Sequence, residues 1–202
     1  IEITTDITRA ATTRDRRVAL IANDKENKHM PNVIDRKGDE QHTLTAFTRA
    51  AIEYLTSNSD NGFFLMVEGG KIDYAAHNKD AVTVFKEINE FAESIELALG
   101  FAEQHPDETL IVVTADHETG GIALGDKYNV KWEVFEQSWN ENGQSNNLDA
   151  EANKALNEQG LIGWTTGDHT GGAVPVYAIG KGAEKFGGRI DNTDIKGKIL
   201  GK

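Results

Sequence analysis

The sequence predicts an α/β fold in which a mostly parallel central sheet is flanked by helices. Two apolar runs, 63–67 and 109–114, are continuous rather than alternating, which is typical of strands buried on both faces. Between them, residues 80–103 carry apolar side chains at alternating spacings of three and four, with a glutamate-rich outer face. This pattern predicts a helix that crosses over the sheet and completes a right-handed strand-helix-strand unit.

The part of the chain before the first of these strands is predicted in two pieces. Residues 1–41 form a polar, irregular, variable segment, in which the short apolar run 18–21 is a candidate strand. Residues 43–57 then place apolar side chains at helical spacing, and Thr43 is a suitable N-cap. We therefore expect an amphipathic helix directly before the strand at 63–67.

The segment 125–160 is expected to be a loop-rich insertion, and its secondary structure stays open. Apolar residues alternate from 128 to 134 as in a strand, whereas the aromatic residues from 132 to 139 have helical spacing. Residues 140–147 read NENGQSNN, which is a surface-loop composition.

The chain then returns to regular structure. Residues 173–179 are a third expected strand, and a glycine-rich loop leads to a short helix at 194–200. No repeat or linker divides the sequence, so we treat residues 1–202 as a single domain.

The composition excludes several classes of protein. With 33 acidic and 21 basic residues the net charge is −12, which argues against nucleic acid as the main partner. No apolar run approaches the roughly 18 residues of a membrane-spanning helix, so no membrane partner is expected. The absence of cysteine removes disulfides, thiolate zinc sites and thiol catalysis. Because the sequence begins without Met and without a secretion signal, we expect the natural protein to extend further toward its N-terminus.

Oxygen and imidazole side chains that suit a divalent metal gather in three short blocks of the sequence. In open α/β sheets, loops at the carboxyl ends of the strands converge on one crevice, and two of these blocks directly follow a predicted strand. The candidate metal ligands are Glu68, Asp73, His77, Asp116, His117 and His169.

Three of these residues form a complete set for one zinc ion. Asp73 and His77 are four residues apart, which on one helical turn places a carboxylate and an imidazole on the same face. His169 adds a second imidazole. Two imidazoles and one carboxylate are the pattern that leaves zinc an open position for substrate or water, as in catalytic sites.

The other three candidates suit two further ions. Asp116 and His117 would supply a second zinc, and two zinc ions about 4 Å apart can clamp both the attacking and the leaving oxygen of a phosphoryl displacement. Glu68 offers only oxygen, which suits magnesium. Taken singly, each residue has an ordinary explanation as a surface pair, a strand end or a turn. The joint pattern is what favours a metal site.

Three sequence blocks closely resemble alkaline phosphatase in order and approximate spacing: GFFLMVEGGKIDYAAH, VVTADHETGG and GDHTGG. The resemblance runs from about Leu44 to the C-terminus, and it implies the C-terminal portion of an alkaline-phosphatase-like fold. It also implies Zn²⁺ at Asp73, His77 and His169, a second Zn²⁺ at Asp116 and His117, and Mg²⁺ at Glu68. In that family Tyr74 and Glu118 occupy variable positions beside ligands, where they would tune the site without being ligands.

The resemblance also implies a location, an assembly and an activity for the protein. Its members are mostly exported, periplasmic or secreted metalloenzymes, usually homodimers. They hydrolyse phosphate monoesters through a phosphoserine intermediate. The full-length protein is therefore expected to be a phosphoric monoester hydrolase.

The chain departs from the family in its catalytic groups. The nucleophilic serine, the phosphate-binding arginine, one further aspartate ligand and another magnesium ligand belong to N-terminal motifs that this sequence lacks. The serines present stand in helix or polar-loop contexts: Ser57, Ser59, Ser94, Ser138 and Ser145. We therefore expect no catalytic residue in this chain, no turnover by the chain alone, and the missing N-terminal half as its partner. Substrate-binding residues stay unassigned.

Two other interpretations remain open at this stage. A phosphodiesterase, sulfatase or metal-dependent phosphomutase of the wider superfamily would share the metal scaffold, although the unbroken VEGGKID block favours the monoesterase. The chain could also be a metal-binding fragment without chemistry of its own.

Overall fold

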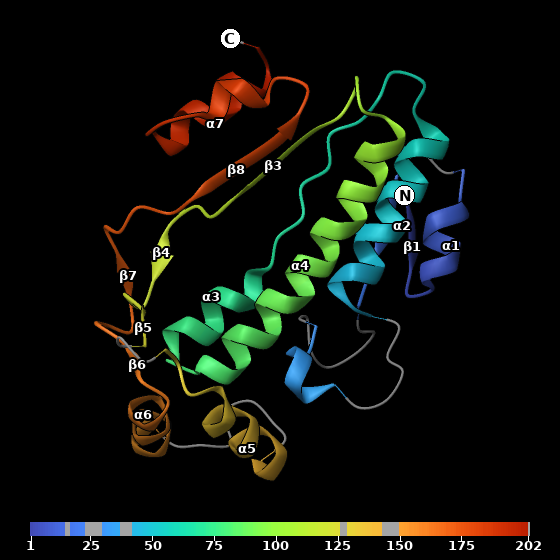
Figure 1. Ribbon diagram of the computed structural model, residues 1–202. Helices are drawn as coiled ribbons and strands as arrows, with labels where there is room; N and C mark the ends of the chain where they lie inside the picture. The colour runs from blue at the N-terminus through green and yellow to red at the C-terminus, as the bar shows by residue number, and fades with distance from the viewer. Residues whose placement is uncertain (15–16, 23–29, 37–41, 126–128, 143–149, 202) are drawn as a thin grey trace.

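Helix α4 (Ala81–Gln104) is the longest element, and both α2 (Leu44–Asn58) and α3 (Gly70–His77) pack against it (Figure 1). The computed structural model describes residues 1–14, 17–22, 30–36, 42–125, 129–142 and 150–201. The helices expected at 43–57 and 80–103 are confirmed. The Thr43 side chain accepts a hydrogen bond from the Ala46 amide at 2.9 Å, as an N-cap does.

The described part of the N-terminal segment is regular rather than irregular, which corrects the expectation for 1–41. Strand β1 (Glu2–Thr4), helix α1 (Ile7–Thr12) and strand β2 (Val18–Leu20) follow one another, and β1 pairs with β2 in parallel. The short helix η1 (Val33–Asp35) completes the segment. The strand expected at 18–21 is confirmed. Helix α1 packs against α2, and this contact holds the segment in place. No local sequence pattern predicts the contact.

The strands after α4 form one interrupted antiparallel ladder between two stretches of chain (Figure 1). Strand β3 (Leu110–Thr114) pairs with β8 (Val176–Gly180). Further along, β4 (Glu118–Thr119) pairs with β7 (His169–Thr170), and β5 (Ala123–Leu124) pairs with β6 (Ile162–Gly163). The strands expected at 109–114 and 173–179 are confirmed, but their pairing is antiparallel.

The strand expected at 63–67 is wrong for the described structure, and with it the strand-helix-strand unit. These residues belong to no ladder, and the described partner of β3 is β8. Phe64 and Met66 are 71% and 74% exposed, so the run is not buried on both faces. Of the pairings among the described strands, only β1 with β2 is parallel; a mostly parallel central sheet is not seen there.

The described part of 125–160 is helical, which corrects the expected loop-rich insertion. Helix α5 (Trp132–Asn142) and helix α6 (Ala150–Gln159) pack together. The helical spacing of the aromatic residues was therefore the informative pattern, and the strand alternative is wrong. The loop expected at 140–147 begins inside α5, and its residues 143–147 lie outside the described part of the chain.

Phe135 of α5 explains why the insertion folds against the scaffold. It is buried in a cluster with Ala81 and Ile162, which joins α5 to the start of α4 and to β6. Near the C-terminus, the helix expected at 194–200 is confirmed as α7 (Ile195–Ile199), which follows the short helices η2 (Ala183–Phe186) and η3 (Asn192–Asp194). None of the helices described has the length and apolar character that crossing a membrane requires.

Candidate metal centre

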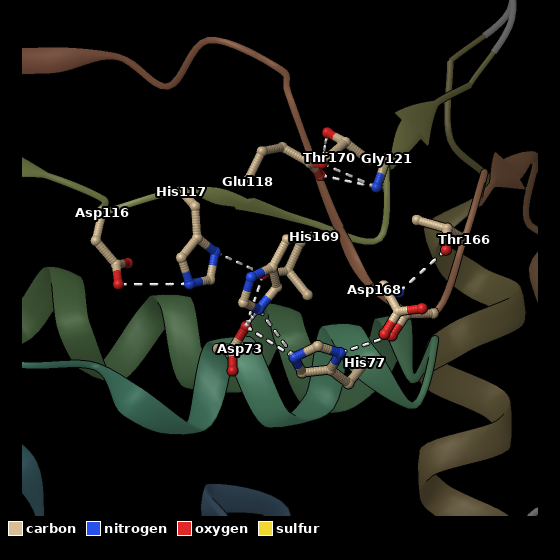
Figure 2. Close-up of polar contacts among 12 residues, drawn as sticks. Asp73, His77, Asp116, His117, Glu118, Gly121, Thr166, Asp168, His169 and Thr170 are labelled. Atoms are coloured by element: carbon tan, nitrogen blue, oxygen red, sulfur yellow. Dashed lines mark hydrogen bonds and ion pairs between the residues drawn. The ribbon is translucent and has the colours of Figure 1, made fainter. Parts of the chain in front are cut away.

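Five of the six predicted ligands, all except Glu68, approach one another where the antiparallel ladder is interrupted above helix α3 (Figure 2). Asp116 and His117 lie in the short stretch between β3 and β4, where the chain leaves the ladder. His169 begins β7 on the opposite stretch. Asp73 and His77 project from one face of α3, one helical turn apart, as their spacing predicted.

Three ligand atoms form a compact triangle. Asp73 Oδ1 is 3.4 Å from His77 Nε2 and 3.7 Å from His169 Nε2, and the two imidazole nitrogens are 3.2 Å apart. A tetrahedral zinc ion with bonds of about 2.0–2.1 Å separates its ligand atoms by about 3.4 Å. The side chains are a third to a half exposed, so the triangle is open on one side. The donor set and its spacing therefore fit a zinc ion with an accessible fourth position.

His117 lies beside the same triangle. Its ring stacks on His169 with centroids 3.5 Å apart, and ligand atoms of Asp73, His117 and His169 all lie within 4.8 Å of one another. His117 Nε2 is 3.4 Å from Asp116 Oδ2, whose side chain is exposed. Asp116 and His117 thus form an acid-imidazole pair directly next to the first set, an arrangement suited to a second ion.

Hydrogen bonds fix the orientation of two imidazoles. His77 Nδ1 lies 2.6 Å from the Gly167 carbonyl, which can only accept, so Nδ1 donates this hydrogen bond and Nε2 is the ring nitrogen that faces the triangle. The Thr119 hydroxyl donates to Asp73 Oδ1 at 2.6 Å and lies 3.2 Å from His117 Nδ1. Both ligands on helix α3 are therefore held by groups from outside the helix: His77 by the Gly167 carbonyl and Asp73 by the Thr119 hydroxyl.

Glu118 joins the two ladder stretches through its carboxylate. The carboxylate accepts hydrogen bonds from the Gly121 amide, at 2.9 and 3.0 Å, and from the Thr170 hydroxyl. Thr170 is also its partner in the pairing of β4 with β7. Glu118, the residue directly after His117, is thus engaged in holding the turn together.

The structure does not bring Glu68 into the group of ligands that it gathers among the described residues. Glu68 is exposed at the end of the extended run before α3, and its carboxylate leans over the start of that helix near Gly70. Tyr74, the other residue expected to tune the site, lies on α3 with its ring 5.6 Å from the Lys71 ammonium.

Sequence reasoning missed the groups that orient the ligands. Neither Thr119 nor the Gly167 carbonyl carries a periodic signal. The one available hint was position, since Thr119 follows His117 by two residues and Gly167 precedes His169 by two. Such partners become visible only when two distant loops are placed side by side.

The mixed helix-strand fold and the cluster of carboxylates and imidazoles define the class: an α/β protein built around a candidate divalent-metal site. Comparison with known families is more specific. The alkaline phosphatase family model matches residues 25–200. The chain belongs to the alkaline phosphatase family.

Individual relatives agree with this assignment. The chain is 33% identical to alkaline phosphatase 3 of Bacillus subtilis over 85% of its length. Among solved structures it resembles a cold-active alkaline phosphatase from a Shewanella species, at a TM-score of 0.80 and 28% identity over 99% of the chain. It also resembles a variant of the alkaline phosphatase from the Antarctic bacterium TAB5 solved with Mg bound in its M3 site, at a TM-score of 0.69 and 33% identity over 98% of the chain. The expected alkaline-phosphatase-like fold is confirmed.

The relatives are considerably longer than this chain. It covers 46% of the Bacillus enzyme, 58% of the Shewanella structure and 51% of the TAB5 structure. The chain thus spans less than half the length of the Bacillus relative and little more than half of the solved chains.

Proposed function

We propose that this chain is the metal-binding C-terminal part of an alkaline phosphatase, and that the full-length protein hydrolyses phosphate monoesters. The observation that carries the proposal is the triangle of Asp73 Oδ1, His77 Nε2 and His169 Nε2, with edges of 3.2–3.7 Å. Such a triangle matches the spacing that zinc imposes on its ligands and leaves one side open for a substrate oxygen.

The three predicted ions would differ in how completely this chain holds them. Asp73, His77 and His169 would bind the first Zn²⁺, Asp116 and His117 part of the second, and Glu68 one oxygen of a Mg²⁺ site. When bound, such ions neutralise charge on phosphoryl oxygens and polarise the ester for displacement. The chain's own contribution is orientation: His77 through the Gly167 carbonyl, and Asp73 through the Thr119 hydroxyl.

The remaining groups of the reaction would come from polypeptide that this sequence does not contain. The proposal includes a phosphoserine intermediate, with the nucleophilic serine and the phosphate-binding arginine supplied by an N-terminal half of the same protein. Exposed apolar side chains support such a partner: Phe64 and Met66 on the extended run, and Tyr177 and Ile179 on β8. By its family the protein is further proposed to be periplasmic or secreted and to form homodimers.

Zinc retention tests the metal site. After dialysis of the chain against metal-free buffer, we expect the wild type to retain zinc. The double variant His77→Ala plus His169→Ala should lose this zinc, because one carboxylate is left where three ligands stood. Metal analysis of the dialysed proteins measures the difference.

A matched variant removes two imidazoles away from the cluster. His42 lies near the Thr5 carbonyl and His105 stacks on Phe101, so His42→Ala plus His105→Ala should leave the zinc content unchanged. Equal zinc in the wild type and in the variant lacking His77 and His169 would refute the proposed site.

A further inference from the structure

Thr119 lies between the ligands of the two proposed zinc sites, and we propose that its hydroxyl is a positioning group shared by both. The proposal rests on the proposed function, because it concerns how the same ligands are held. Thr119 Oγ1 is 2.6 Å from Asp73 Oδ1 and 3.2 Å from His117 Nδ1. Asp73 belongs to the first site and His117 to the second, so one oxygen touches both.

The direction of the two hydrogen bonds follows from counting hydrogens. A hydroxyl has one hydrogen, and the Asp73 carboxylate can only accept, so that hydrogen points to Asp73 Oδ1. The Thr119 oxygen then has only lone pairs to offer His117. A hydrogen bond between these groups therefore requires His117 Nδ1 to donate to the Thr119 oxygen, which leaves Nε2, 3.4 Å from Asp116 Oδ2, as the nitrogen that a metal would use.

The backbone fixes where this hydroxyl can be. Thr119 is the ladder partner of His169 in the pairing of β4 with β7. The preceding residue, Glu118, anchors the same strand to Thr170 and to the Gly121 amide. Thr119 thus touches two members of the group Asp73, His117 and His169 through hydrogen bonds, and lies in register with the third.

The consequence is a coupling between the sites. Groups that hydrogen-bond to metal ligands typically change metal affinity by about 10–100-fold when they are removed. A hydroxyl that orients ligands of two ions should change the affinity for both. If Thr119 served only to fill space in the strand, valine would replace it without loss, because valine has the same shape and suits a strand.

The test compares wild type, Thr119→Val and Thr119→Ser in zinc titrations against a chromophoric chelator. We expect Thr119→Val to weaken both zinc-binding steps by about 10–100-fold, and Thr119→Ser, which keeps the hydroxyl, to stay within about threefold of wild type. Unchanged affinity in Thr119→Val, or equal weakening in both variants, overturns the positioning role. A wild type that binds no zinc at all overturns the proposed function as well, so the two failures are distinguishable.

A spectroscopic readout keeps the proposal testable even if Thr119→Val folds poorly. In the zinc-loaded wild type, the long-range proton-nitrogen spectrum should show the His117 Nδ1 proton, protected from exchange with water by its bond to Thr119. The protection should persist in Thr119→Ser and disappear in Thr119→Val. A His117 Nδ1 proton that exchanges in the wild type as fast as an exposed imidazole overturns the inference.

Discussion

Gly120 shows how strongly a single residue constrains the loops that carry the ligands. It follows Thr119 and has φ of 90°, a backbone conformation that L side chains rarely adopt. Its amide donates to the Asp168 carbonyl at 2.9 Å, and its own carbonyl accepts from the amides of Thr165 and Thr166 at 2.9 and 3.1 Å. This turn therefore ties the β4 stretch to the loop that precedes His169.

We predict that Gly120→Ala lowers the free energy of unfolding by about 2–4 kcal/mol, from the positive φ and from overpacking. The added Cβ would lie 2.5 Å from Cε3 of Trp164, whose indole ring fills the space against the turn. Denaturant unfolding followed by circular dichroism measures the change.

Gly100 provides the control for this substitution. It lies within α4, and a Cβ built there meets nothing within 4 Å. Gly100→Ala should stabilise the chain by about 0.5–1 kcal/mol, since alanine loses less conformational freedom than glycine in a helix. An unfolding midpoint for Gly120→Ala equal to that of wild type would contradict the steric argument.

At the level of elements, helix α4 buries carboxylates that its sequence pattern placed on an outer face. Glu87 and Glu90 are only 5% and 7% exposed. Glu90 forms a two-point ion pair with Arg36, and Glu87 accepts a hydrogen bond from the Val33 amide at 2.7 Å. The segment carrying η1 covers this face of the helix, while Ile88, an apolar residue of the same helix, is exposed.

Burial raises the pKa of Glu87 above its usual range, assisted by nearby Glu90 and opposed by the Val33 amide, Arg36 and Lys71. The folded chain therefore holds the Glu87 proton more tightly than the unfolded chain. The stability that this proton provides is complete below the unfolded pKa of about 4.3 and is lost as the pH rises through the higher folded pKa.

We accordingly predict that Glu87→Gln, which can still accept from Val33, becomes more stable relative to wild type as the pH rises from 4 to 8. Each unit of displacement of the pKa corresponds to about 1.4 kcal/mol. Unfolding free energies measured across this pH range test the slope. Glu96→Gln, at an exposed position of the same helix, controls for the loss of one charge. A stability difference between Glu87→Gln and wild type that does not vary with pH would rule out this explanation.

Considered as a whole molecule, the chain exposes more surface than a folded protein of its size should. Its accessible surface is 13355 Å² at 22.1 kDa. A folded monomer of that mass is expected to expose about 9,300 Å², which leaves an excess of about 4,000 Å². Permanent interfaces bury about 2,000–5,000 Å² or more counted over both partners, so an excess of this size on one partner corresponds to an interface at or above the upper end of that range. The exposed apolar side chains of the 63–67 run and of β8 contribute to the excess, in agreement with the proposed need for further polypeptide.

The matching prediction is that this chain alone, supplied with Zn²⁺ and Mg²⁺, does not turn over an aryl phosphate. Nucleophile and phosphate-binding groups act as a unit, and removing such a unit typically lowers kcat by about 10⁶-fold. Product release followed by absorbance measures the rate, with an intact alkaline phosphatase as the positive control. A zinc-dependent burst followed by steady turnover would show that the chain carries a nucleophile of its own.

The sequence by itself determined the parts of this protein that depend on local pattern. Helices α2 and α4, the cap at Thr43, and the pairing of Asp73 with His77 on one helical turn all follow from spacings of three and four residues, which one stretch of chain enforces alone. The proposed metal ligands could also be recognised from the sequence, because a carboxylate or an imidazole has the same ligand chemistry wherever it lies in the fold.

Only the tertiary structure decided which distant segments meet. Three contacts show this. Strand β3 pairs with β8, Glu87 is buried beneath η1 through its hydrogen bond with Val33, and Thr119 bonds to Asp73. Each of these contacts joins residues at least 46 positions apart in the sequence. An apolar run such as 63–67 signals burial but does not specify what covers it. Strand pairing and ligand orientation depend on where other segments place their donors and acceptors, and that is settled when the whole chain packs.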